Sequence, residues 1–168
     1  MRFDSQKKLS CWADLKNINV YIDQEEILSN INISLNHGEN TLILGPNGSG
    51  KSTFLKLLNR SIYPINSNNS SFKLFNKDNI NIWDLRKKIG FLFKEMEQRV
   101  NIGVNLYDVI ISGFSGTFNS RYSKLLSERE KIKIDNLINE WELNNIIFNE
   151  FKSLSDGQKR RALLARAL

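Results

Sequence analysis

The chain has 168 residues, a length that fits one domain with a buried core. Its 24 Lys and Arg residues exceed its 18 Asp and Glu residues, and the net charge of +6 favours an anionic partner such as a nucleotide, a nucleic acid or an acidic membrane surface. A lone cysteine, Cys11, excludes an internal disulfide framework, and no stretch approaches the roughly 18 apolar residues of a membrane span. We therefore expect a cytoplasmic protein, either free or peripheral on the cytoplasmic face of a membrane.

Two early segments alternate apolar and polar residues, the pattern of strands that bury one face. They are "INVYI", from Ile18 to Ile22, and "INISL", residues 31–35. In the first strand Tyr21 is expected to point away from the face that Ile18, Val20 and Ile22 bury.

The next segments predict the order strand, loop, helix. Residues 37–39 form a turn, and "TLIL", residues 41–44, is a short apolar run typical of a fully buried parallel strand. This strand is expected to end at Gly45. After a glycine-rich segment, "KSTFLKLLNR", residues 51–60, places its apolar residues at helical spacing.

The middle of the chain predicts a turn and two further strands. The polar cluster at residues 64–71 is interpreted as a turn within one domain, because too little chain flanks it for two cores. "FKLF", residues 72–75, and "IGFLF", residues 89–93, are both expected to be strands, the second one buried on both faces.

Residues 127–143 predict an amphipathic helix that begins with a capping box of Ser127 and Glu130. Its apolar residues recur at offsets of a helical face, and they are Ile134, Leu137, Ile138 and Trp141.

A phosphate-binding pattern, G-x-x-x-x-G-K-[ST], occurs in "GPNGSGKST", residues 45–53. Glycines allow left-handed backbone and close approach, so backbone N–H groups and the following helix N-terminus can face one phosphate chain. Lys51 would reach the β- and γ-phosphates, and the Ser52 hydroxyl would bind Mg²⁺. The pattern indicates a nucleotide, but kinases, GTPases and transport ATPases share it.

A second anion-binding feature is predicted in "SLSDGQKRRALLARAL", residues 153–168. Ser155 and Gln158 form a capping box, and Gly157 removes side-chain bulk from the first helical turn. A helix N-terminus of this kind can bind an anion, although a capping box alone is more typical of an ordinary capped helix.

Taken together, "GPNGSGKSTFLKLL" and "LSDGQKRRALLARAL" resemble the Walker A segment and the signature motif of the ABC ATPases, and the resemblance spans nearly the whole chain. It implies an α/β fold, a P-loop NTPase domain of ABC type with an N-terminal antiparallel β subdomain and a helical insert at about residues 102–153. Residues 1–168 would form one such domain, lacking its C-terminal part.

The resemblance also implies the binding site and the partners. ATP and Mg²⁺ would be the cofactors, and Tyr21 would stack on adenine. Two nucleotide-binding domains would enclose ATP between them, and the helical insert would contact a transmembrane subunit. The expected ATP-binding residues of the loop are Gly45, Pro46, Asn47, Gly48, Ser49, Gly50, Lys51, Ser52 and Thr53, and those that would face a γ-phosphate bound to the partner are Ser155, Gly157 and Gln158.

Three departures from the family pattern alter these expectations. Asp156 stands where a glycine is more usual and places a carboxylate near a phosphate site. The family's Q-loop glutamine is expected at Lys94, so the nearest glutamine, Gln98, becomes the candidate for the Mg²⁺ and water contact. The Walker B carboxylates and the switch histidine would follow the signature helix, but the sequence ends at Leu168; the only histidine, His37, is expected to be a surface residue.

From these departures we expect a chain that binds ATP but does not hydrolyse it alone, because no catalytic base is present. We also expect the isolated chain to be marginally stable or prone to aggregation, because the missing strand would lie beside the predicted strand at residues 41–44.

The leading hypothesis is the ATP-binding subunit of an ABC transporter, which in the intact family couples ATP hydrolysis to transport. One alternative is a non-catalytic nucleotide-binding module. Another is a soluble ABC protein that acts on ribosomes or nucleic acid, which is less favoured because Lys and Arg are dispersed along the chain. A P-loop kinase would explain the glycine-rich loop but not "LSDGQ".

Overall fold

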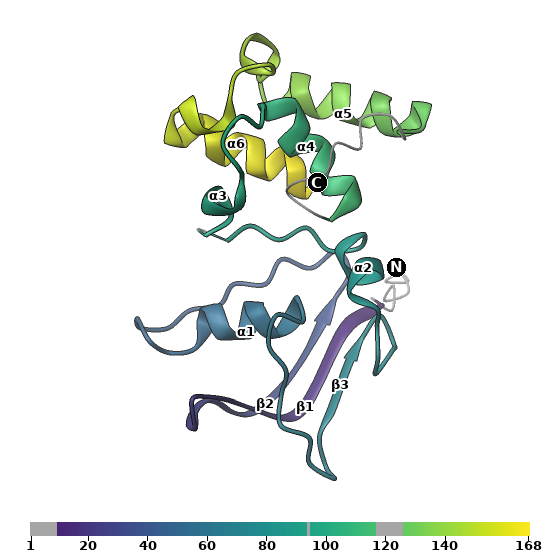
Figure 1. The fold of residues 1–168 in the computed structure, drawn as a ribbon. Helices are drawn as coiled ribbons and strands as arrows, with labels where there is room; N and C mark the ends of the chain where they lie inside the picture. Colours follow the sequence, from purple (N-terminus) through teal and green to yellow (C-terminus); the bar gives the residue numbers. More distant parts are fainter. Residues whose placement is uncertain (1–9, 94, 117–125) are drawn as a thin grey trace, which may run out of the picture. The chain divides into compact units, whose positions relative to one another are not determined.

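The structure is a computed structural model that describes residues 10–93, 95–116 and 126–168 (Figure 1). The chain divides into two compact units, Met1–Ile82 and Trp83–Leu168. The elements of the first unit are β1 (Cys11–Ile22), β2 (Glu25–Asn36), α1 (Lys51–Leu58) and β3 (Ser71–Leu74). Those that follow are α2 (Ile82–Arg86), α3 (Met96–Arg99), α4 (Leu106–Ser115), α5 (Glu128–Glu140), the 3₁₀ turns η2 (Asn144–Ile146) and η3 (Phe151–Ser153), and α6 (Asp156–Ala167).

An antiparallel sheet in the order β2-β1-β3 forms the frame of the first unit, as Figure 1 shows. All three strands include a segment that the sequence predicted as a strand. Helix α1 contacts β2. The buried apolar side chains of this unit come from the sheet and from α1, and they are Ala13, Leu15, Ile18, Val20, Leu28, Leu35, Phe54, Leu57, Leu58, Phe72 and Leu74.

The pairing of β1 with β2 shifts register at four places, and two of these shifts are bulges that include an asparagine with a positive φ. At Asn17 strand β1 carries one extra residue, and at Asn30 strand β2 carries one, each with a positive φ of 51° and 48°. Because an extra residue shifts the alternation of faces, Leu15 and Ile18 are both buried although three positions separate them. The bulges therefore keep the apolar residues of a long strand in one core.

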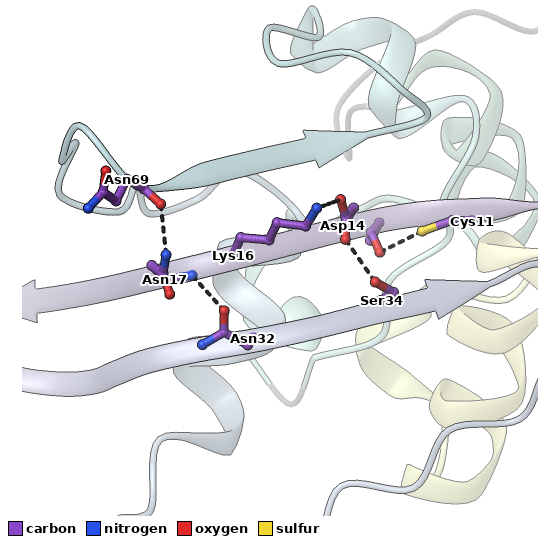
Figure 2. Close-up of polar contacts among 8 residues, drawn as sticks. Cys11, Asp14, Lys16, Asn17, Asn32, Ser34 and Asn69 are labelled. Atoms are coloured by element: carbon purple, nitrogen blue, oxygen red, sulfur yellow. Dashed lines mark hydrogen bonds and ion pairs between the residues drawn. The ribbon is translucent and has the colours of Figure 1, made fainter.

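Asparagine side chains satisfy the backbone at these bulges, and Figure 2 shows the contacts of Asn17. The Asn17 N–H donates to Asn32 Oδ1 at 2.9 Å, and Asn17 Nδ2 donates to the Asn69 carbonyl at 2.8 Å. At the second bulge the Asn30 N–H donates to Asn19 Oδ1. Asparagine tolerates left-handed backbone and offers both a donor and an acceptor, which suits it to these positions.

The expected exposure of Tyr21 is confirmed, but the expected burial of Ile22 is wrong, because Ile22 is 40% exposed. Strands β1 and β2 are joined by a two-residue turn at Asp23 and Gln24, both with positive φ. Ile22 lies next to this turn, beyond the last buried pair of the two strands, and so has no core to contact.

The strands predicted at residues 41–44 and 89–93 are not formed. Leu42 and Leu44 are 79% and 80% exposed, and residues 89–93 are irregular and mostly half-buried. A strand exists only where a neighbour pairs with its backbone, and the sheet within the described residues includes neither segment.

Helices α4 and α6 pack together in the second unit (Figure 1). Glycines permit close approach there: a Cβ at Gly113 would overlap the Arg166 carbonyl oxygen, and a Cβ at Gly90 would overlap the carbonyl of Ala167. The unit buries one apolar cluster, whose members are Met96, Val100, Leu106, Val109, Ile110, Ile111, Ile134, Leu137, Ile138, Leu143, Ile147, Phe151, Leu154, Ala162, Leu163 and Ala165.

Arg166 is the charged member of this packing. Its Nε donates to Ser112 Oγ at 3.0 Å, and Ser112 is fully buried and donates to the Val109 carbonyl at 2.6 Å. Burial, with the nearby positive charges of Arg86 and Arg99, lowers the pKa of Arg166 to about 10.

The predicted amphipathic helix corresponds to α5, and its capping box is present: the Ser127 hydroxyl accepts from the Glu130 N–H, and Glu130 accepts from the Ser127 N–H. The helix ends at Glu140, earlier than predicted, and Trp141 is its half-buried C-cap. No helix within the described residues is long and apolar enough to cross a membrane.

Candidate functional site

The loop that carries the phosphate-binding pattern, residues 45–50, leads directly into α1. Gly48 and Gly50 have φ of 84° and 82°, a left-handed backbone that other residues adopt only with strain. A Cβ on Gly50 would also lie 2.6 Å from Leu28 Cδ2 and 3.1 Å from the Ile27 carbonyl oxygen. Gly50 is therefore required both by the turn and by the close passage of β2.

Lys51 folds its ammonium back over this loop. Its Nζ donates to the carbonyls of Gly45 and Pro46 at 2.9 and 2.6 Å, and it lies 3.4 Å from Ser49 Oγ. The Ser49 N–H donates to the Pro46 carbonyl at 3.3 Å, which closes the loop into a turn. A positive charge is thus held at the centre of a backbone loop, as binding of a polyphosphate requires.

The N-terminus of α1 adds to this positive character. Gly50 is the N-cap and makes no side-chain cap, and no acidic residue occurs in the first turn. The first N–H groups of the helix therefore have no competing carboxylate on their own helix, and the helix dipole favours an anion there. Ser52 is exposed and Thr53 is half-buried in this turn.

The described residues can hold Mg²⁺ through a single hydroxyl group, but they offer no cluster of metal-binding side chains. No cluster of three or more His, Cys, Asp or Glu side chains that could hold a metal exists in the described parts of the chain. Mg²⁺ commonly binds through few protein groups together with phosphate oxygens and waters. The exposed Ser52 hydroxyl at the start of α1 suits this kind of coordination.

Tyr21 lies near the turn of the β1–β2 hairpin, directly after the buried Val20. Its hydroxyl donates to Glu26 Oε1 at 3.0 Å, and the hydrogen bond to this carboxylate raises the pKa of Tyr21. Sequence reasoning missed Glu26. A two-residue turn at residues 23–24 fixes the pairing of Tyr21 with Glu26, so the register could have revealed it.

Arg60 is a second residue that sequence reasoning missed. It follows α1 with a φ of 58°, its guanidinium carbon lies 4.1 Å from the centre of the Phe72 ring, and its Nη2 donates to the Asp78 carbonyl at 2.9 Å. Burial lowers the pKa of Arg60. Arg60 thus joins the C-terminal end of α1 to β3, and no sequence motif signals this contact.

The predicted capping box at Ser155 is present at the N-terminus of α6. Ser155 Oγ accepts from the Gln158 N–H at 3.4 Å, and Gln158 Oε1 accepts from the Ser155 N–H at 2.9 Å. Asp156 and Gly157 are exposed, and a Cβ on Gly157 would contact no atom within 4 Å. The first turn of α6 is therefore exposed and carries one carboxylate, that of Asp156.

Gln98 lies exposed on the short helix α3, where its N–H donates to the Glu95 carbonyl at 3.2 Å. Lys94, where the resemblance leads us to expect the Q-loop glutamine, lies outside the described residues. His37 is exposed, as expected, and its ring lies 5.8 Å from that of Phe75. The loop and Tyr21 belong to the first unit, whereas the α6 N-terminus and Gln98 belong to the second.

A family model described as "ABC transporter" matches residues 28–168, a range that includes both predicted anion-binding features. The chain belongs to the ABC transporter family. The match begins in β2 and includes the loop, α1 and the whole of α6. The sequence resemblance is confirmed.

Two relatives illustrate this membership. The zinc uptake system ATP-binding protein ZurA of Listeria innocua is 30% identical over 156 residues, which cover 92% of this chain and 58% of that protein. The phosphate import ATP-binding protein PstB of Staphylococcus saprophyticus is 29% identical over an alignment of 180 residues. This alignment covers 98% of this chain and 57% of that protein. The chain therefore spans less than two thirds of the length of these relatives.

A solved structure shows the same fold. The structure of cbiO1 from Clostridium perfringens, part of the ABC transporter complex cbiONQ, has a TM-score of 0.72 at 25% identity and covers 94% of this chain and 61% of that chain. The α/β fold of an ABC ATP-binding domain, with its N-terminal antiparallel sheet, is thus confirmed.

Proposed function

We propose that this chain is the ATP-binding part of an ABC importer and that it binds Mg²⁺-ATP at residues 45–53. The observation that carries the proposal is the Lys51 ammonium, held over a loop of left-handed glycines at a helix N-terminus without acidic residues. Its relatives are named as ATP-binding proteins of uptake and import systems, which supports import. Because these relatives name different cargos at similar identity, we assign import without a particular cargo.

In this proposal each part of the loop has a separate role. The N–H groups of the loop and of the first turn of α1 bind the phosphates, and Lys51 contacts the β- and γ-phosphates. Ser52 contributes its hydroxyl to Mg²⁺, and Tyr21 stacks on the adenine. When bound, ATP supplies the phosphoanhydride bond whose hydrolysis drives transport in the intact family.

In this proposal the second unit contacts a second ATP-binding domain and a transmembrane subunit. Ser155, Gly157 and Gln158 face the γ-phosphate held by a second ATP-binding domain. The exposed first turn of α6 supports this role. Residues 102–153 would contact a transmembrane subunit, which places the assembly on the cytoplasmic face of a membrane.

Titration calorimetry of Mg²⁺-ATP into the full chain and its Lys51→Ala variant tests this function. Hydrogen bonds to charged groups contribute about 1.5–3 kcal/mol, so we expect Lys51→Ala to weaken ATP binding about ten- to a hundredfold. Lys56→Ala serves as a matched control, because Lys56 is exposed in the last turn of the same helix. Equal affinities of wild type and Lys51→Ala would refute the proposed site.

A further inference from the structure

The loop contains the only Asn-Gly step of the sequence, Asn47–Gly48. Both residues are exposed, and Gly48 has a left-handed backbone with no atom within 4 Å of where a Cβ would lie. Both residues of this step are therefore accessible to solvent. Because glycine has no Cβ, the backbone after Asn47 also has more conformational freedom than it would have before any other residue.

The chemistry of this step needs a backbone nitrogen that is free to react. Within the described ranges, neither the Gly48 N–H nor the Asn47 side chain takes part in a hydrogen bond. The Gly48 nitrogen can attack Asn47 Cγ, forming a C–N bond while the bond from Cγ to the side-chain nitrogen breaks. Ammonia leaves with the proton of the backbone amide, and a five-membered succinimide remains. Water then opens either carbonyl of this ring, giving aspartate or isoaspartate.

Two other asparagine steps, which lie in an exposed turn, lack this freedom. Asn66–Ser67 and Asn69–Ser70 are also steps to a small residue, but the Ser67 N–H donates to Ser70 Oγ at 3.0 Å and the Ser70 N–H donates to the Ser67 carbonyl at 3.0 Å. A nitrogen whose hydrogen is bound and whose turn is closed cannot easily approach the preceding side chain. These two steps form internal controls in the same chain.

We propose that Asn47 is a site of spontaneous deamidation within the nucleotide loop and that the modification weakens nucleotide binding. The second part rests on the proposed function. Aspartate adds a negative charge to a loop whose Lys51 ammonium and helix N-terminus favour anions. Isoaspartate in addition lengthens the backbone by one carbon between Pro46 and Gly48, which displaces the N–H groups that would contact phosphate.

The first experiment measures the modification without reference to nucleotide. The full chain is incubated at physiological temperature, and peptide mass spectrometry with isoaspartyl methyltransferase labelling locates the converted residues. We expect Asn47 to be modified several-fold faster than Asn66 or Asn69, and Asn47→Gln to abolish the label at this position because its ring closure is much less favourable. Equal or faster modification at Asn66 or Asn69 would overturn the assignment of the site.

The second experiment measures the consequence. Calorimetry compares ATP affinity before and after ageing, and Asn47→Asp reproduces one product. Aged protein and Asn47→Asp are both expected to bind ATP several-fold more weakly, whereas unchanged affinity in both would overturn the consequence for binding. Failure of the proposed function is distinguishable, because fresh wild-type protein would then bind no ATP while Asn47 still became modified.

Discussion

Gly38 and Gly50 share a left-handed backbone, with φ of 77° and 82°, but their surroundings differ. A Cβ on Gly38 would meet no atom within 4 Å, whereas a Cβ on Gly50 would lie 2.6 Å from Leu28 Cδ2 and 3.1 Å from a backbone oxygen. Gly38→Ala should lower the free energy of unfolding by about 1–2 kcal/mol through backbone strain alone. Gly50→Ala should add an overpacking cost of about 1–3 kcal/mol.

Urea denaturation of the two variants and the wild type checks this prediction, since the difference between the variants isolates the contact with β2. Indistinguishable midpoints for Gly38→Ala and Gly50→Ala would show that Leu28 and the backbone of β2 move aside without cost.

At this scale the sequence predicts motif residues well and their partners poorly. The spacing of glycines and Lys51 specifies a loop and helix start, because the backbone conformation depends on local residue type. The Glu26 contact of Tyr21 and the Phe72 contact of Arg60 are formed by residues distant in sequence or on another strand, so they depend on register and packing. The same holds for Ile22, whose exposure follows from where the buried pairs end.

The capping boxes of α5 and α6 differ in the residue at the third helical position. It is Glu130 in α5, which can carry a charge, and Gln158 in α6, which cannot. Hydrogen bonds from the Ser127 hydroxyl and N–H lower the pKa of Glu130, because they favour its charged form. A carboxyl whose folded pKa is lowered stabilises the fold above its unfolded pKa and loses this contribution as the pH falls through the folded pKa. The Gln158 box has no such dependence.

Urea midpoints measured from neutral pH down to acid test the role of Glu130. Wild type should lose more stability than Glu130→Gln in the window between the ordinary glutamate pKa and the lowered one, and the variant should resemble wild type at the acid end. Parallel pH profiles would show that the charge of Glu130 contributes nothing to the cap.

The two capped helices were predicted correctly, whereas the predicted strands formed only where another strand of the sheet pairs with them. Helices α5 and α6 form where a capping box precedes good helix formers, because hydrogen bonds within a helix are local. Residues 41–44 and 89–93 are apolar enough for strands, but a strand needs pairing along its edge. An apolar run indicates that a segment tends to be buried. It does not indicate whether another strand lies beside the segment to form hydrogen bonds with it.

For the molecule as a whole, the division into two units predicts where ATP stabilises the chain. A ligand that binds only the folded state at a hundred times its Kd adds about 2.7 kcal/mol to the free energy of unfolding. The proposed ATP site lies within Met1–Ile82, so this gain should concentrate there. AMP lacks the β- and γ-phosphates that Lys51 would contact and should stabilise the unit less at equal concentration.

Hydrogen exchange measured by mass spectrometry resolves the two units peptide by peptide. We expect Mg²⁺-ATP to slow exchange in peptides of residues 10–82, and AMP to do so weakly. Protection confined to residues 83–168, or equal protection by AMP, would contradict the placement of the site.

Gly90 and Gly113 impose a restriction on how this chain can evolve. Each faces a backbone carbonyl near the end of α6, and backbone, unlike a side chain, cannot be replaced by a smaller residue to make room. Compensating substitutions at Arg166 or Ala167 are therefore of no help, since every residue retains its carbonyl oxygen. A scan of all single substitutions, scored by survival of the folded protein, should leave both positions with glycine as the sole tolerated residue, although neither belongs to a nucleotide-binding motif.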